Sequence, residues 1–121
     1  MIFGIGTDIL EIDRIRDSIN GLDKLANRIC TEFELTEYNK VNPDNKAVYL
    51  AKKWASKEAI SKALGTGIGN GTKWKDFEIS HDILGKPIII FINESFNQYY
   101  GHISISDERD IIVVYTLIET K

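Results

Sequence analysis

The segment Trp54-Ala-Ser-Lys-Glu-Ala-Ile-Ser-Lys-Ala-Leu-Gly-Thr-Gly-Ile-Gly69 predicts the end of a long helix and a glycine-rich loop that follows it. At about 3.6 residues per turn, small residues fall on one continuous face of this helix. Glu58 and Lys62 are predicted to lie within that face, one turn apart, while Ile60 and Leu64 lie roughly opposite. A helix with apolar residues on two sides is expected to be largely covered. The small-residue face consists of Ala47, Val48, Ala51, Ala55, Ala59 and Ala63.

The pair Glu58 and Lys62 has two interpretations. A glutamate followed four residues later by a lysine is a common exposed pair that supports a helix. A carboxylate and an ammonium under cover, however, need a partner, a metal or a ligand. Their position within the alanine face favours a functional site. Gly65 is predicted to stop the helix, and Gly67 and Gly69 follow at alternate positions.

The first residues predict a strand over 2–8, in which Gly4, Gly6 and Asp8 share one face. Glycine weakens a strand unless another part of the protein packs close to it. We therefore expect a close contact at this face, with Asp8 at the end of the strand. Alternatively, Asp8 caps the helix that follows.

The remaining pattern predicts three short helices, one long helix and then four strands. Thr31 and Glu34 have the spacing of a capping box. The last strand is a run of isoleucine and valine, which indicates a central strand buried on both faces. This order is typical of an α+β fold with a mostly antiparallel sheet packed against the long helix. The predicted helices are 12–19, 22–29, 32–41 and 46–64, and the later strands are 74–82, 88–92, 102–106 and 111–119.

Composition narrows the class of protein. A chain of 121 residues with 43% hydrophobic and 27% charged residues is expected to be one soluble domain, residues 1–121. The net charge of −3 gives no overall attraction to nucleic acid or to an anionic membrane. No apolar run approaches the roughly 20 residues that span a bilayer. The single Cys30 cannot form an internal disulfide, and the N-terminus does not resemble a signal peptide, so a cytoplasmic protein is expected.

Four side chains could carry chemistry, namely Asp8, Glu58, Lys62 and His102. Two carboxylates without a third strong ligand suit Mg²⁺, which takes further oxygens from water and phosphate. Lys62 could meet a phosphate oxygen, and the glycine loop could offer backbone N–H groups. Asp8 alone is more often a helix cap, and a lone histidine is more often structural. Only the combination predicts a magnesium site for a di- or polyphosphate compound.

Four groups of segments, which span nearly the whole chain, resemble one family. The sequence is similar to the holo-acyl-carrier-protein synthases, the short bacterial class of 4′-phosphopantetheinyl transferases. The segments keep the order and spacing of that family, and the one that begins at Trp54 is the most specific. They are 4–9 with 11–15, 28–31 with Glu34 and Leu35, 54–69 with 74–79, and 85–87 with 102–106.

The resemblance implies an enzyme that moves the 4′-phosphopantetheine group of coenzyme A to a serine of apo-acyl carrier protein. Adenosine 3′,5′-bisphosphate would leave, and the reaction would support fatty acid biosynthesis. Asp8 and Glu58 match the carboxylates that bind Mg²⁺ in the family. Glu58, directly or through a metal-bound water, would be the base for the serine. Lys62 would stabilise charge on the leaving group.

The resemblance also implies binding residues and an assembly. Arg14 matches a residue that grips the acidic carrier protein, and the family is typically a homotrimer with sites in clefts between subunits. The second predicted helix departs from the family, because only Lys24 and Arg28 are basic there. The expected contacts to coenzyme A are Ser61, Lys62, Gly65, Thr66, Pro87 and His102.

The alternative hypothesis is a non-catalytic module that binds acyl carrier protein or a nucleotide. Such a module has no need for Asp8 and Glu58 together with Lys62. A small structural domain would not explain the glycines beside Asp8. The enzyme is therefore the leading hypothesis.

Overall fold

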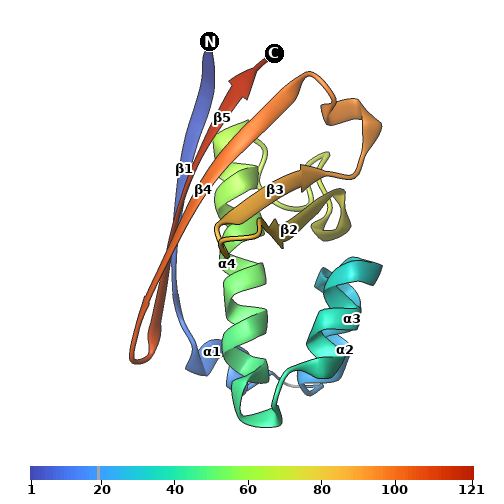
Figure 1. The fold of residues 1–121 in the computed structure, drawn as a ribbon, viewed down its shortest axis with the longest axis vertical. Helices are drawn as coiled ribbons and strands as arrows, with labels where there is room; N and C mark the ends of the chain where they lie inside the picture. The colour runs from blue at the N-terminus through green and yellow to red at the C-terminus, as the bar shows by residue number, and fades with distance from the viewer. Residues whose placement is uncertain (19) are drawn as a thin grey trace.

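The computed structural model describes residues 1–18 and 20–121, and its longest helix is α4 (Lys46–Leu64). The other elements are β1 (Ile2–Glu11), α1 (Asp13–Arg16), α2 (Leu22–Ile29), α3 (Glu32–Lys40), β2 (Phe77–His81), β3 (Pro87–Phe91), β4 (Tyr99–Glu108) and β5 (Ile111–Thr120). A three-stranded sheet in the order β1-β5-β4 lies along one side of α4, and the β2–β3 hairpin, α2 and α3 lie on the other (Figure 1). All strand pairs are antiparallel, which confirms the predicted α+β class.

The helix α4 has the predicted bounds, and other elements bury most of it, as predicted. It ends where Gly65 adopts a left-handed conformation, with φ of 82°, that glycine reaches at little cost. Twelve of its 19 residues are buried, because the sheet covers one side and α2, α3 and the hairpin cover the other. In the part of the chain that the structure describes, no helix combines the length and the apolar character needed to cross a membrane.

Glycine allows β1 to lie directly on the backbone of α4. A Cβ atom at Gly6 would stand 2.0 Å from the carbonyl oxygen of Ala59, and one at Gly4 would stand 2.0 Å from that of Ala63. Alanine on the helix and glycine on the strand therefore form one contact between backbones. The close packing predicted for this face of β1 is confirmed, and its partner is the alanine face of α4.

Replacing Gly6 by alanine is expected to lower the free energy of unfolding by about 3 kcal/mol, because the methyl group meets the backbone of Ala59. Chemical denaturation of the variant and the wild type measures this change. The matched control is Gly101→Ala, where the new Cβ meets the mobile ends of the Ile89 and Ile118 side chains at 2.8 and 2.9 Å. An equal loss in the two variants would contradict the prediction.

The N-terminal elements differ from their predicted bounds. The strand predicted over 2–8 continues to Glu11, because β1 stays paired with β5 over its whole length. Asp8 therefore lies inside a strand, and the alternative that it caps the next helix is wrong. The helix predicted over 12–19 is the single turn α1, and Ile19 lies outside the described residues.

The hairpin begins later than predicted. The strand expected over 74–82 starts at Phe77, because Trp74–Asp76 form a short 3₁₀ turn. Asp76 stabilises this turn by accepting a hydrogen bond from the backbone N–H of Lys73 at 2.8 Å. From Phe77 onward β2 pairs with β3, as the sequence predicted.

The strand β5 is the central strand of its sheet, as predicted, but it is buried on one face only. Its inner residues contact α4 and are fully buried. Its outer residues remain 40–47% exposed, so the prediction of two-sided burial is wrong for the single chain. The inner residues are Ile112, Val114, Thr116 and Ile118, and the outer ones are Ile111, Val113 and Tyr115.

A buried ion pair joins α4 to three other elements. Lys57 Nζ donates to Glu34 Oε1 and to the carbonyl oxygen of Ile29, both at 2.6 Å, and neither charged side chain is exposed. Glu34 also accepts from the backbone N–H groups of Thr31 and Ile79, at 2.9 and 2.8 Å. The predicted capping box is confirmed, but its glutamate also neutralises a lysine 23 residues later.

Candidate active site

Asp8, Glu58 and Lys62 come together where β1 lies against the C-terminal half of α4. Asp8 lies on the same face of β1 as Gly6, so its carboxylate faces the helix. Lys62 Nζ donates to Asp8 Oδ1 at 2.9 Å and to the carbonyl oxygen of Thr7 at 3.0 Å. The glycine contact therefore places a strand carboxylate beside the two charged residues of the helix.

Glu58 carries a carboxyl group whose pKa is raised above its ordinary value. Partial burial is the main cause, and the negative charge of Asp8 adds to it, while Lys62 acts in the opposite direction. The neighbouring carboxylates thus repel one another in a partly desolvated place. A raised pKa makes Glu58 a stronger base than an exposed glutamate, and it also indicates that a cation would be favoured there.

The pair lies at the rim of the alanine face. Ala59 and Ala63 are buried against β1, but Glu58 is half-buried and the Lys62 side chain is 50% exposed. The expectation that the pair lies under cover is therefore wrong for Lys62 and only partly met for Glu58. A helix turn places neighbouring side chains about 100° apart, so residues next to buried alanines emerge at the edge of the contact.

The two carboxylates fit a magnesium ion by their chemistry. Asp8 and Glu58 supply oxygen ligands, and their mutual repulsion would be relieved by a divalent cation. Among residues 1–18 and 20–121, no group of three or more metal-binding side chains gathers. With two protein ligands, the remaining coordination positions of the ion would be taken by oxygens of water and phosphate. This is the arrangement that Mg²⁺ commonly takes.

The first backbone N–H groups of the loop after α4 are bonded to the end of the helix. The N–H groups of Thr66 and Gly67 both donate to the carbonyl oxygen of Ser61, at 3.0 and 3.2 Å, and that of Gly65 donates to Lys62. These three N–H groups close the helix end in this chain, and the expectation that the loop offers N–H groups to phosphate stays a prediction. The Ser61 hydroxyl is buried and donates to the carbonyl oxygen of Glu58 at 2.7 Å. The coenzyme contacts expected from Ser61, Gly65 and Thr66 stay predictions.

His102 lies on the opposite face of the sheet from Asp8. Asp8 pairs with Val114, which is buried against α4, whereas His102 pairs with Leu117 on the outer face. His102 Nε2 lies 2.7 Å from a carboxylate oxygen of Glu119. One chain therefore does not bring His102 to the Asp8 carboxylate. Pro87 begins β3, in the hairpin on the other side of α4.

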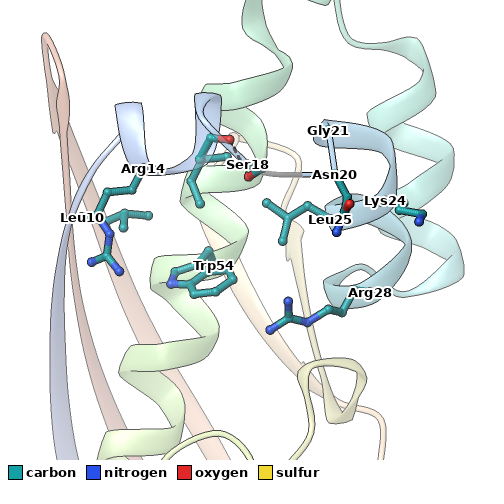
Figure 2. Close-up of a pocket in the computed structure, with 10 residues that line it drawn as sticks. Leu10, Arg14, Ser18, Asn20, Gly21, Lys24, Leu25, Arg28 and Trp54 are labelled. Carbon is teal, nitrogen blue, oxygen red and sulfur yellow. Dashed lines mark hydrogen bonds between the residues drawn. The ribbon is translucent and has the colours of Figure 1, made fainter.

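A groove opens one helical turn from Glu58. It has a volume of about 390 Å³ and is bounded by the end of β1 and by α1, α2 and α4. Three cationic side chains line it, those of Arg14, Lys24 and Arg28. Figure 2 shows the Arg28 guanidinium reaching toward Trp54, and it lies 5.9 Å from the centre of that ring. The groove is therefore cationic and partly apolar, although the whole chain is negatively charged.

The sequence profile of the 4′-phosphopantetheinyl transferase superfamily matches residues 4–115. The chain belongs to this superfamily. The transferase is 44% identical over 126 aligned positions to a holo-[acyl-carrier-protein] synthase of Shewanella denitrificans, with 98% of each chain covered. It is 40% identical over 128 positions to the same enzyme of Vibrio cholerae, with both chains covered completely. The resemblance inferred from the motifs is confirmed.

Solved structures agree with this membership. The transferase matches a holo-(acyl-carrier-protein) synthase of Bacillus anthracis, crystallised in complex with CoA (3′,5′-ADP), with a TM-score of 0.88. The identity is 37%, and the match covers 100% of this chain and 99% of the other. The synthase of Helicobacter pylori in complex with coenzyme A gives a TM-score of 0.82 at 27% identity, with 95% and 99% covered.

Of the residues that line the groove of the transferase, sequence reasoning gave only Arg14 a role, in binding the carrier protein. It noted Lys24 and Arg28 as the basic residues of the second predicted helix but did not place them beside Arg14, and it did not connect Trp54 with either. Trp54 precedes Glu58 by four residues, so both lie along one line of α4. That spacing was the available signal that Trp54 borders the site.

Proposed function

We propose that this chain transfers the 4′-phosphopantetheine group of coenzyme A to a serine of apo-acyl carrier protein, in support of fatty acid biosynthesis in the cytoplasm. One observation carries the proposal, namely that the Asp8, Glu58 and Lys62 cluster adjoins a cationic groove. Leu10 of the groove follows Asp8 by two residues on the same face of β1. The names and bound coenzyme of the relatives support the same substrates.

In the proposed reaction, the serine oxygen bonds to the phosphorus atom that carries pantetheine. The bond from that phosphorus to the pyrophosphate bridging oxygen breaks, and adenosine 3′,5′-bisphosphate leaves. Glu58, directly or through a metal-bound water, would take the serine proton. Lys62 turns from Asp8 to the phosphate oxygens and stabilises their negative charge. Mg²⁺, held by Asp8 and Glu58, would neutralise phosphate charge when bound.

The experiment is the intact mass of a purified apo-acyl carrier protein after incubation with this protein, coenzyme A and Mg²⁺. We expect a gain of one phosphopantetheine, and we expect a chelator to prevent it. If several carrier proteins gain no mass, transfer is excluded. A calorimetric titration with coenzyme A and with carrier protein would then test the non-catalytic binding module.

The groove is the proposed docking site for the carrier protein. Its cations would attract an acidic partner, and its apolar residues Leu10 and Trp54 would contact the partner's apolar side chains. Because the groove adjoins Glu58, a docked carrier could present its serine to that carboxylate. Arg14 is expected to act together with Arg28, since both line the same groove.

Reversing the charge of Arg14 or Arg28 is expected to raise KM for the carrier protein about tenfold, because attraction becomes repulsion. KM for coenzyme A should stay within about twofold, and the effect on the carrier should weaken at high salt. Steady-state kinetics in both substrates measures this. Arg16→Glu is the matched control, because Arg16 lies outside the groove and pairs with Asp13 at 2.8 Å. An equal effect of Arg16→Glu would contradict the assignment.

A homotrimer with sites between subunits is the proposed assembly. Two observations support it. The outer face of the β1-β5-β4 sheet exposes a set of apolar side chains that a second copy could cover. His102, a predicted coenzyme contact, lies on that face and would meet the carboxylates of another copy rather than its own. The exposed apolar residues include Ile5, Ile9, Ile111, Val113 and Tyr115.

Light scattering after size-exclusion chromatography is expected to give three times the mass of the chain. Val113→Lys places a charge at the centre of the outer sheet face and should shift the mass to that of the monomer. Ile88→Lys is a matched control, because Ile88 and Val113 are 40% and 41% exposed but Ile88 lies on the hairpin. A wild-type chain that is monomeric would overturn the assembly.

A further inference from the structure

Thr72 ends the glycine-rich loop and is almost completely buried, with 1% of its surface exposed. Its hydroxyl Oγ1 donates to the carbonyl oxygen of Gly67 at 2.7 Å. Its own carbonyl oxygen accepts from the backbone N–H of Gly69 at 2.8 Å. One residue thus binds the loop at two points, from its side chain and from its backbone.

The hydroxyl of Thr72 also joins the loop to the end of α4. It lies 3.2 Å from the hydroxyl of Thr66. The Thr72 hydrogen is donated to Gly67, and the Thr66 hydroxyl also lies 3.4 Å from the carbonyl oxygen of Ser61, to which it can donate. The two hydroxyls therefore belong to one cluster that links Ser61, at the end of α4, to Gly67 in the loop. A methyl group in place of the Thr72 hydroxyl would remove the bond to Gly67 and the polar contact with Thr66.

The N–H groups of residues 65–67 hold the start of the loop against the helix end, and beyond them Thr72 makes most of the bonds. The loop's glycines at 65, 67, 69 and 71 all have positive φ, and a Cβ at any of them would meet no atom within 4 Å. Glycine loses more conformational entropy on folding than any other residue, so such a segment is ordered only by its bonds. Asn70 adds an exposed bond to the carbonyl oxygen of Thr66 at 3.3 Å, and Ile68 is half-buried.

We propose that Thr72 is a positioning residue for coenzyme A, whose buried hydroxyl holds the loop 65–71 in the conformation that receives the coenzyme beside Lys62. This inference rests on the proposed function, which places Gly65 and Thr66 among the coenzyme contacts. Thr72 does not touch the coenzyme in this role. It acts by removing alternative conformations of the loop before binding, which lowers the entropy lost when the coenzyme binds.

The test compares Thr72→Val, which has the same shape but no hydroxyl, with Thr72→Ser, which keeps the hydroxyl. Thr72→Val leaves the Gly67 carbonyl without its hydroxyl donor and removes the contact with Thr66, and it is expected to raise KM for coenzyme A roughly tenfold. The effect on kcat should be much smaller, and KM for the carrier protein should stay within about twofold of wild type. Thr72→Ser is expected to restore most of the affinity for coenzyme A.

Amide hydrogen exchange without ligand gives a second readout. Residues 65–71 should exchange at least several-fold faster in Thr72→Val than in wild type or Thr72→Ser, while β5 stays protected. Unchanged exchange in the loop would overturn the hydrogen-bonding role of Thr72. Faster exchange with an unchanged KM for coenzyme A would overturn the positioning role. A wild-type chain that does not bind coenzyme A would instead refute the proposed function and, with it, the link to the coenzyme.

Discussion

Glu58→Gln is expected to lower kcat for phosphopantetheine transfer by about 10³-fold, because the amide cannot take the serine proton. The same change removes one of the two carboxylates proposed to hold Mg²⁺, so higher metal concentration should recover little of the loss. The fold should remain, since glutamine has nearly the same shape. Burial and the charge of Asp8 disfavour the charged form of Glu58, so the neutral amide is also expected to raise thermal stability slightly.

Single-turnover mass spectrometry of the carrier protein measures the loss, and circular dichroism measures the stability. Glu32→Gln serves as the control, because Glu32 is an exposed glutamate at the start of α3. It should leave kcat unchanged. Normal turnover in Glu58→Gln would exclude both of its proposed roles. A variant that is inactive because it is unfolded would be recognised by its circular dichroism spectrum.

Lys57→Met is expected to have the largest effect on stability, a loss of about 3–5 kcal/mol. The Glu34 carboxylate would remain fully buried without its counter-ion, although the N–H groups of Thr31 and Ile79 still donate to it. A loss of this size is a large part of the total stability of a small domain, which is about 5–15 kcal/mol. Urea denaturation with wild type as the reference measures the change.

The double variant Glu34→Gln with Lys57→Met should recover part of that stability, because no unpaired charge remains. Lys52→Met is the control on the same helix. Lys52 lies 3.8 Å from Asp107, both side chains are substantially exposed, and the pair should contribute less than about 1 kcal/mol. If Lys57→Met were no more harmful than Lys52→Met, the proposed importance of the buried pair would be wrong.

Local rules predicted α3 and α4 nearly to the residue. The capping box at Thr31 starts α3, and the left-handed Gly65 ends α4. Each of these signals acts within one turn of the helix end that it determines. The same rules failed where a partner distant in sequence decides the outcome. Asp8 followed by an apolar pattern looks like a helix cap, but pairing with β5 keeps that segment in a strand.

The candidate site was predictable where residue type and spacing are enough. Glycine at alternate strand positions indicated a close contact beside Asp8, and the structure shows that the partner is the alanine face of α4. Glu58 and Lys62 were predicted together because they lie one turn apart. The groove was not predicted, because its residues come from four elements, β1, α1, α2 and α4, whose relative placement no local pattern specifies.

The sequence alone indicated the family, the long helix and close packing at the glycine face of β1. It also indicated the charged residues Asp8, Glu58 and Lys62. Packing in three dimensions decided which charges are buried and which side chains share a face. Lys57 and Lys62 are both lysines of one helix, yet one is fully buried with Glu34 and the other is half exposed beside Asp8. The pairing of the strands likewise decided that His102 and Asp8 lie on opposite faces of one sheet. Burial and pairing between distant residues depend on how whole elements pack, whereas caps and periodicity depend on neighbours in the chain.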